Sequence, residues 1–193
     1  MRTRIEDIRR RELIEAAYET LKERGIRGTT IARISEKVGM TPGIVQYYFK
    51  NKKRLLEETQ RYANGQLRLK AQEYLKDSKT PRERLDAVLR ANVAPDLFIR
   101  PTAQAWLALC VEVPHEPVYA RIQRSLHRRL LSNLRHSLKD LMPHSEAETF
   151  ALELSTMIDG LWLQCATSPS PKDPAAALAL LRGAVARRLG PGR

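Results

Sequence analysis

The chain has 193 residues, of which 42% are hydrophobic and 29% are charged, and its formal net charge is +12. This composition can form a core and argues against a disordered chain, while the positive charge favours a polyanionic partner such as nucleic acid or an anionic membrane. The charged N-terminus and the absence of an apolar run of about 18 residues argue against a secretion signal and a membrane span, so we expect a cytoplasmic protein.

The first predicted helix runs from about Arg4 to Arg24. Its apolar residues fall on one face, and Gly25 is a stop signal because glycine readily adopts the left-handed conformation that ends helices. Three consecutive arginines, Arg9-Arg10-Arg11, lie early in this helix. They can either contact the phosphates of a nucleic acid or form an ordinary solvated face.

A helix-turn-helix pattern follows between residues 29 and 53. Thr30 is a candidate N-cap of a short helix, and Gly39 can take the conformation that ends it. Thr41 then offers a second N-cap, with Pro42 at the first helical position, where no N–H is needed. The second helix of such a motif lies in the DNA major groove with its N-terminal side chains at base edges. The pattern therefore makes DNA binding the leading hypothesis.

The second helix of this motif offers side chains that can read a base sequence. Gln46 is the best candidate, because its amide can pair bidentately with adenine N6 and N7. Ile44 can contact a thymine methyl group, and Gly43 allows the backbone to approach the duplex closely. Lys52 follows at the start of the next helix, where backbone N–H groups also favour an anion such as phosphate.

Local signals predict further helices over the rest of the chain. One helix spans Lys52 to Lys76, and the capping box Thr80-Pro81-Arg82-Glu83 opens the next. The apolar residues 103–113 and the basic residues 118–141 form two more helices. The capping box Ser145-Glu146-Ala147-Glu148 and the cap Asp173-Pro174 open the last two. The apolar segment predicts a buried helix. We therefore predict an all-α protein of about nine helices. It would comprise a small helix-turn-helix domain at residues 1–50 and a larger helical domain at residues 51–193.

The last two predicted helices are candidates for a dimer surface, because motifs of this kind usually act as dimers on DNA half-sites. Apolar residues repeat at three- and four-residue spacing in both helices: Phe150, Leu154, Met157, Ile158, Leu161 and Cys165, then Leu178, Leu181 and Val185. Together these stripes exceed what one small core needs. Gly160 costs about 1 kcal/mol relative to alanine inside a helix, which the close approach of another helix or a ligand would explain.

Nothing in the sequence indicates catalysis. Cys110 and Cys165 lie far apart in apolar segments, as reduced core thiols do. The four histidines have no metal-ligand spacing, and no phosphate-binding loop or nucleophile motif is present. We therefore expect no enzyme, no metal and no cofactor. A nucleoid-type protein that binds DNA without sequence preference is a rival interpretation, which a steep salt dependence would reveal.

The three-helix head, the lysine-rich start of the fourth helix and the larger helical body resemble the TetR family of bacterial repressors. The resemblance is carried by Thr29-Thr30, Ile34, Val38-Gly39, Gly43, Tyr47-Tyr48-Phe49, Asn51-Lys52 and Leu55-Leu56. It implies a homodimer, joined by a four-helix bundle, that binds a double-stranded DNA operator through residues 1–50 and a small-molecule effector through residues 51–193. By family position, the residues that contact phosphates or the groove wall would be Thr30, Thr41, Tyr47, Tyr48 and Lys52.

Motifs spread over most of the chain are similar to one subfamily, the BetI repressors. They are Ile8-Arg9-Arg10-Arg11, Ala105-Trp106-Leu107-Ala108, residues 128–134 and Ile158-Asp159-Gly160-Leu161-Trp162-Leu163. This resemblance implies a repressor of choline-to-glycine-betaine genes that choline releases from DNA. Leu109 and Cys110 follow Trp106 where that subfamily has more aromatic residues, so a different cationic or hydrophobic effector is the alternative.

Candidate effector-binding residues fit a quaternary ammonium ligand. Asp159 and Trp162 are three residues apart and share a helix face, while Trp106 lies in the sixth helix with Glu112 near its end. Aromatic faces attract a cation, and a carboxylate balances its charge. Tyr119 is a further candidate for the aromatic cage. In the competing interpretation Trp162 is a core residue and Asp159 pairs with a basic residue of a neighbouring helix.

Overall fold

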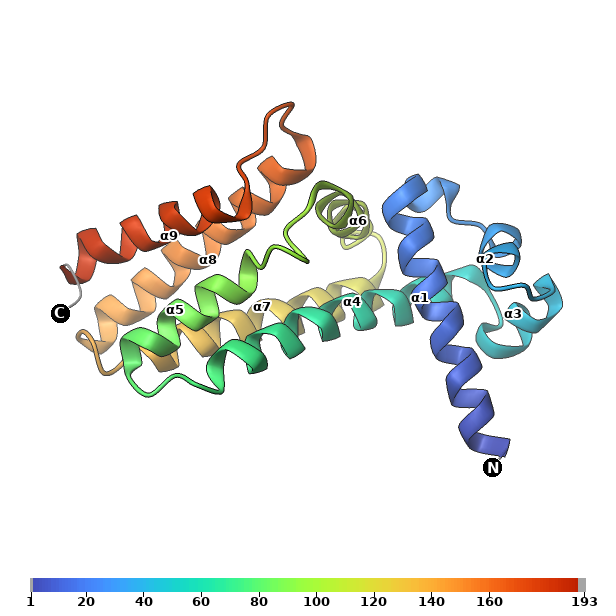
Figure 1. Ribbon diagram of the computed structural model, residues 1–193, viewed down its shortest axis with the longest axis horizontal. Helices are drawn as coiled ribbons and strands as arrows, with labels where there is room; N and C mark the ends of the chain where they lie inside the picture. The colour runs from blue at the N-terminus through green and yellow to red at the C-terminus, as the bar shows by residue number, and fades with distance from the viewer. Residues whose placement is uncertain (1, 191–193) are drawn as a thin grey trace. The chain divides into compact units, whose positions relative to one another are not determined.

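The computed structural model describes residues 2–190, with side chains from Ile5 onward. Over this range the chain forms nine α-helices and no β-strand, which confirms the predicted all-α fold (Figure 1). In chain order the helices are α1 (Arg2–Gly28), α2 (Ile31–Lys37), α3 (Pro42–Phe49), α4 (Lys52–Leu75), α5 (Pro81–Asn92), α6 (Arg100–Val111), α7 (Pro117–Leu138), α8 (His144–Thr167) and α9 (Pro174–Leu189).

The described residues fall into two compact units. The first unit combines the chain up to Gly65 with Gln104–Gln123, and the second combines Gln66–Ala103 with the chain from Arg124 onward. Helices α4, α6 and α7 each contribute residues to both units. A segment that is distant in the sequence therefore packs with the N-terminal helices.

The first unit has two apolar clusters. One joins α1, α2, α3 and the start of α4, and its buried members are Leu13, Ala16, Ala17, Ile34, Val45, Phe49 and Leu55. The other joins α1 and α4 to the end of α6 and the start of α7, and its buried members are Leu21, Leu56, Ala105, Leu109 and Tyr119. These clusters fix the helix-turn-helix on one side and the α6–α7 segment on the other.

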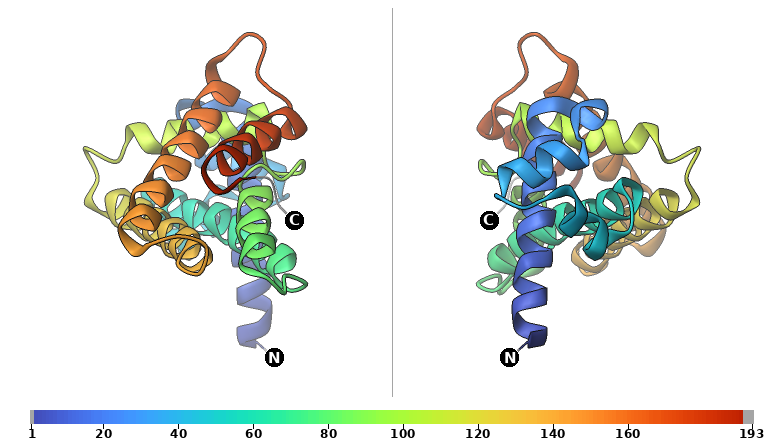
Figure 2. Two further views of the ribbon diagram at one scale, coloured as in Figure 1. Left: turned by 90° about the vertical axis from the view of Figure 1, so that its left-hand side faces the viewer. Right: turned by 90° about the vertical axis from the view of Figure 1, so that its right-hand side faces the viewer.

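Helix α1 is interrupted at the glycine that the sequence predicts as its end. Gly25 has φ 64° and ψ −179°, and a short helical segment then continues to Gly28. A side chain would be strained at this positive φ, so glycine permits the break. Figures 1 and 2 show the first turns of α1 extending past α2 and α3.

Most of the predicted caps are present. The Thr30 hydroxyl accepts from the backbone N–H of Arg33 at 3.3 Å. At the start of α4, the Asn51 side chain also accepts from the backbone N–H of Arg54 at 2.9 Å. Thr80 and Glu83 form the predicted capping box, and Asp173 accepts from the N–H of Ala176 at 2.7 Å. Each cap satisfies a backbone donor that the first helical turn leaves unpaired.

Three local predictions need correction. Thr41 is the N-cap of α3, but its side chain makes no capping hydrogen bond. Helix α8 begins before the predicted Ser145 capping box, because the Pro143 carbonyl already accepts the helical bond from the N–H of Ala147 at 2.9 Å. Helix α6 is not buried on most sides: Ala105 and Leu109 face the core, while Val111 is 60% exposed.

The second unit contains α5, α8 and α9. Figure 1 shows α8 and α9 side by side, and α9 also packs on α5. Two arginines join α5 and α9. Arg182 forms a double hydrogen bond with the Asp86 carboxylate at 2.6 and 2.8 Å, and Arg82 donates to the last carbonyls of α9, those of Leu189 and Gly190.

The apolar stripes predicted for a dimer surface lie mainly in the core of the subunit. Within those stripes the buried residues are Phe150, Leu154, Ile158, Leu161, Cys165 and Leu181. The stripe assignment was wrong because helical spacing identifies an apolar face but not the element that covers it. Other leucines of these helices are exposed, namely Leu152 (54%), Leu163 (46%) and Leu180 (43%).

Candidate DNA-binding surface and effector region

The turn between α2 and α3 is built by local backbone bonds. Gly39 has φ 65°, and the N–H groups of Val38 and Met40 both donate to the carbonyl of Ser35. Pro42 then opens α3, as expected for a residue that has no N–H to satisfy. The inner faces of the two helices are fixed by Ile34, Val45 and Phe49, all at most 1% exposed.

The opposite face of α3 is open to solvent. Pro42, Gly43, Ile44, Gln46 and Tyr47 are all exposed, with Ile44 at 40% and Tyr47 at 72%. The caps Thr30 and Thr41 are exposed as well. Because Val45 and Phe49 hold the helix from behind, these side chains are presented on a fixed support.

Tyr48 and Lys52 are partly engaged within the first unit. Tyr48 is half-buried and packs edge-to-face on Tyr47, with ring centroids 5.3 Å apart. The Lys52 ammonium donates to the carbonyl of Ile26 at 2.8 Å. Lysine has three N–H donors, so this bond leaves capacity for a phosphate oxygen.

The arginine run of α1 divides into two roles. Arg9 and Arg11 are exposed and pair within α1, with Glu12 at 2.7 Å and Glu15 at 2.9 Å. Such exposed pairs contribute little to stability.

Arg10 instead reaches across the first unit. Its guanidinium donates to the Tyr48 carbonyl at 3.1 Å, lies 4.6 Å from the Phe49 ring centroid and is 3.8 Å from the Glu58 carboxylate. Arg10 therefore connects α1, the end of α3 and α4. Its position in an arginine run did not reveal this role.

Three of the predicted effector residues lie in the first unit. Trp106 and Glu112 are half-buried, whereas Tyr119 is only 3% exposed. Burial, together with the nearby carboxylates of Glu57, Glu112 and Glu116, raises the pKa of Tyr119 to about 12. Tyr119 therefore keeps its proton at neutral pH.

The other two predicted residues, Asp159 and Trp162, lie in the second unit. The Trp162 indole N–H donates to the carbonyl of Asn92 at 2.8 Å, and its ring packs edge-to-face on Phe98 with centroids 5.5 Å apart. Asp159 is half-buried, and this burial raises the pKa of its carboxyl while His127 opposes the shift. Both side chains therefore have neighbours within their own unit.

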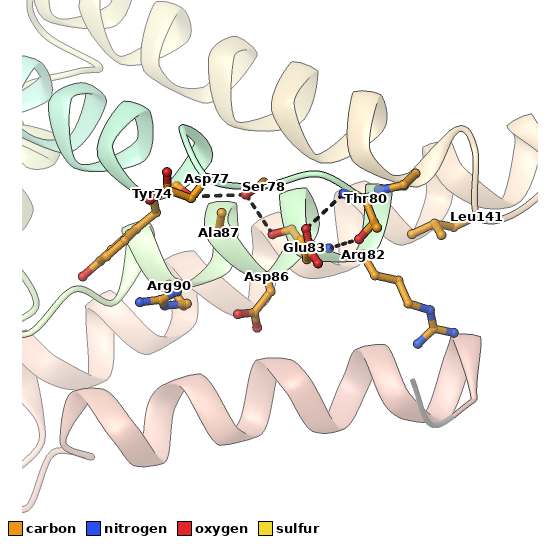
Figure 3. A pocket seen from close by; sticks show the side chains of 11 residues that line it. Tyr74, Asp77, Ser78, Thr80, Arg82, Glu83, Asp86, Ala87, Arg90 and Leu141 are labelled. Atoms are coloured by element: carbon orange, nitrogen blue, oxygen red, sulfur yellow. Dashed lines mark hydrogen bonds between the residues drawn. The ribbon is translucent and has the colours of Figure 1, made fainter. Parts of the chain in front are cut away.

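A pocket of about 710 Å³ lies in the second unit, near the connection of α4 and α5 (Figure 3). Its lining contains none of the predicted effector residues. The polar groups that line it are largely engaged: Glu83 accepts from the N–H groups of Lys79 and Thr80, and Asp86 holds Arg182. The pocket therefore offers few free groups to a ligand.

Three buried side-chain oxygens without a hydrogen-bond partner were not predicted from the sequence. The side-chain oxygens of Gln60, Gln123 and Ser155 are buried and have no hydrogen-bond partner among the described residues. Gln60 is four residues after Leu56, so helical spacing alone could have placed it on the inner face of α4. No sequence signal shows that these oxygens lack a partner.

Within residues 2–190, no helix combines the length and the apolar character that a membrane span requires. Among the same residues, no group of three or more histidine, cysteine, aspartate or glutamate side chains could hold a metal ion.

Comparison with known proteins identifies both parts of the chain. Residues 13–59 match the family model described as bacterial regulatory proteins, tetR family, and residues 81–190 match that of the BetI-type transcriptional repressor, C-terminal. The BetI regulator of Klebsiella pneumoniae (strain 342) is 36% identical over 179 residues, 91% of each chain. That of Burkholderia mallei (strain NCTC 10229) is 37% identical over 186 residues, 96% of this chain and 95% of its own.

Crystal structures share the fold. A regulator from Saccharomonospora viridis in complex with choline has a TM-score of 0.80 at 21% identity, covering 92% of this chain and 95% of its own. A TetR regulator from Haloarcula marismortui has a TM-score of 0.83 at 19% identity, covering 92% and 96%. The curated relatives are named transcriptional regulators, which confirms that the protein is not an enzyme. The chain belongs to the TetR family and is a transcriptional repressor of the BetI type.

Proposed function

We propose that this protein is a cytoplasmic homodimer that represses genes for the conversion of choline to glycine betaine, and that choline releases it from its operator. The observation that carries this proposal is the match of residues 81–190 to the BetI-type repressor domain, joined to a solvent-exposed recognition helix. In this proposal residues 1–50 bind DNA, and residues 51–193 bind the effector and the second subunit.

The exposed face of α3 supports the DNA contacts. Gln46 would read an adenine in the major groove, while Ile44 would contact a thymine methyl group and Gly43 would allow close approach of the backbone. Phosphates and the groove wall would be contacted by Thr30, Thr41, Tyr47, Tyr48 and Lys52. Phosphate contacts position the protein and base contacts specify the site, so Gln46 would determine the operator sequence more than the others.

The exposed leucines of α8 and α9 support the dimer. Leu152, Leu163 and Leu180 are each at least 43% exposed, although the core-facing stripes of the same helices are covered. Gly160 and Gly183 are half-buried in these helices, and apart from the adjacent helix backbone no atom lies within 3 Å of a Cβ added at either. We infer that these residues form the contact between subunits, where small side chains allow close helix approach.

Choline as the effector is supported by the choline complex of the Saccharomonospora viridis regulator and by the chemistry of the predicted residues. In the second unit, Asp159 would balance the positive charge and Trp162 would offer an aromatic face to the quaternary ammonium group; in the first unit, Trp106 and Tyr119 are the aromatic candidates. Glu112 would add a second carboxylate. A TetR-family repressor that responds to another cationic or hydrophobic ligand is the alternative.

Release would follow from a shift between conformations. An effector weakens DNA binding only if it binds the DNA-incompetent arrangement more tightly than the competent one. Helix α4 begins directly after the recognition helix, so a change in its tilt would alter the separation of the two recognition helices in a dimer. Half-sites have a set spacing, and a changed separation would prevent both helices from binding together.

The test is fluorescence anisotropy of an operator selected from random DNA by this protein, titrated with choline at fixed salt. We expect release by choline and no release by glycine betaine, with scrambled DNA of equal length as the control. Specific binding that is indifferent to choline would leave the repressor assignment intact and transfer the effector assignment to the alternative ligand class. Equal affinity for scrambled DNA would contradict sequence-specific repression.

A further inference from the structure

Two buried amide oxygens in the first unit lack hydrogen-bond partners. They are the Oε1 atoms of Gln60 in α4 and Gln123 in α7, and neither has a donor among the described residues. Gln60 is only 3% exposed. A buried acceptor without a donor loses the hydrogen bonds that water would supply, so a polar side chain at such a position calls for a partner.

The two glutamines lie on helix faces that approach each other. Leu56 of α4 and Tyr119 of α7 are members of the same buried cluster, and the neighbouring Glu57 carboxylate is close enough to influence the Tyr119 hydroxyl. Gln60 is three residues after Glu57, and Gln123 is four residues after Tyr119. Residues at these spacings share a helix face, so each glutamine lies one turn beyond the contact between α4 and α7.

The buried groups near this contact are rich in hydrogen-bond acceptors. Two amide oxygens are unpartnered, and the third acceptor is the Glu57 carboxylate, which is 4% exposed and paired with Arg54 at 2.8 Å. Acceptors of this kind attract a hydroxyl or N–H donor and a positive charge. A carboxylate is disfavoured here by the negative charge of Glu57 and by the two amide oxygens, which in this orientation accept but do not donate.

We propose that Gln60 and Gln123 provide two acceptor oxygens, one of which accepts the hydrogen bond from the donor group, a hydroxyl or an N–H, of a small cationic effector. This inference rests on the proposed function and deepens it by naming the polar end of the effector site. It places a ligand contact on α4 between two and three turns after the helix begins, within the unit that carries the helix-turn-helix. It also explains how the protein would distinguish a hydroxyl-bearing cation from a zwitterion that carries a carboxylate.

The experiment compares three ligands that share a quaternary ammonium group. Choline has a hydroxyl, ethyltrimethylammonium has a hydrogen in its place, and glycine betaine has a carboxylate. Binding of each to the full-length protein is measured by isothermal titration calorimetry for wild type, Gln60→Met, Gln123→Met and the double variant Gln60→Met/Gln123→Met. Methionine preserves the length and flexibility of glutamine but removes the strong acceptor. Gln72→Met, at an exposed position of α4, is the matched control.

We expect the wild type and the Gln72→Met control to bind choline about three- to tenfold more tightly than ethyltrimethylammonium, the effect of one hydrogen bond to a buried acceptor. The choline hydroxyl has one proton to donate, so the two cations should bind with nearly equal affinity in the double variant Gln60→Met/Gln123→Met, which lacks both acceptors. The melting temperature of ligand-free Gln60→Met should not fall, because the substitution removes an unpartnered buried oxygen. This thermal measurement also shows that the variant is folded.

Retention of the full choline preference in the double variant Gln60→Met/Gln123→Met would overturn the proposal and leave the effector assignment standing. Equal binding of the two cations by the wild type would do the same. If the wild type binds neither cation, the choline assignment of the proposed function fails together with this inference, while specific DNA binding is unaffected. Tighter binding of glycine betaine than of choline would also contradict an acceptor-rich site.

Discussion

The exposed face of α3 and the residues proposed to bind the effector differ in whether their polar side chains already have partners. On α3, Gln46 and Tyr47 are exposed, and the contacts that hold the helix are made by its other face. Of the residues proposed to bind the effector, Tyr119 is buried in the first unit, and Trp162 donates a hydrogen bond to Asn92 within the second unit. A DNA-reading side chain must be free, because the duplex supplies its partner. An effector-binding side chain can be held in place beforehand, which reduces the entropy lost on binding.

The largest expected effect is on the covered face of α3. Phe49→Ala should lower the free energy of unfolding by about 3–5 kcal/mol, because Phe49 is 1% exposed and its removal leaves a cavity. Ile44→Ala, on the exposed face, should change stability by at most about 0.5 kcal/mol. Urea denaturation followed by circular dichroism measures both. Equal losses in the two variants would show that α3 has no separate structural and DNA-reading faces.

A smaller effect is expected on the exposed face. Gln46→Ala should weaken operator binding by about 1–3 kcal/mol, the discrimination carried by one bidentate base contact, with no change in melting temperature. The measurement is anisotropy with the selected operator, together with a scrambled duplex that reports binding to phosphates alone. A similar loss on both duplexes would assign Gln46 to the backbone rather than to a base.

Arg10 offers a test of how α1 and α4 hold the recognition helix α3 in place. Arg10→Met keeps the aliphatic stem but removes the donor to the Tyr48 carbonyl and the charge beside Glu58. We expect operator affinity to fall by about 1 kcal/mol, since one charged hydrogen bond that orients α3 is lost. The control is Arg9→Met, which removes the same charge from an exposed arginine that pairs with Glu12 within α1. An equal loss in both would mean that the charge alone matters, through phosphate attraction.

The sequence predicted the helix-turn-helix well because its determinants are local. Thr30, Gly39 and Pro42 act on their own backbone or on residues one turn away, so spacing reveals their roles. Contacts between distant residues left no such pattern. The reach of Arg10 to Tyr48 crosses 38 positions, and the unpartnered oxygens of Gln60 and Gln123 depend on what packs around them.

The same limit explains the misassigned dimer surface. An apolar stripe on α8 or α9 looks alike whether α5 or another subunit covers it. Helical spacing predicted that Leu154 and Ile158 face another subunit, but both are buried in the subunit's own core. Leu152 and Leu163 of α8 are exposed instead. Helical spacing therefore identified the apolar faces of α8 and α9, but not the subunit's own core that covers them.

The smallest expected effect concerns the charge of Asp159. Burial raises the pKa of this carboxyl above its ordinary 3.8, so folding favours its protonated form. Its contribution to stability is therefore greatest at low pH and falls as the pH rises through the interval between 3.8 and the raised value. A cationic effector requires the opposite state, because only the ionised carboxylate balances its charge.

Choline affinity of the wild type should therefore increase severalfold from pH 4 to pH 7, whereas Asp159→Asn should bind choline more weakly and with little change over this range. Calorimetric titrations at both pH values provide the measurement. Neutral ligands bound at the same site should show no such rise. A wild-type pH dependence that persists in Asp159→Asn would assign the charge balance to another acid, with Glu112 as the next carboxylate to substitute.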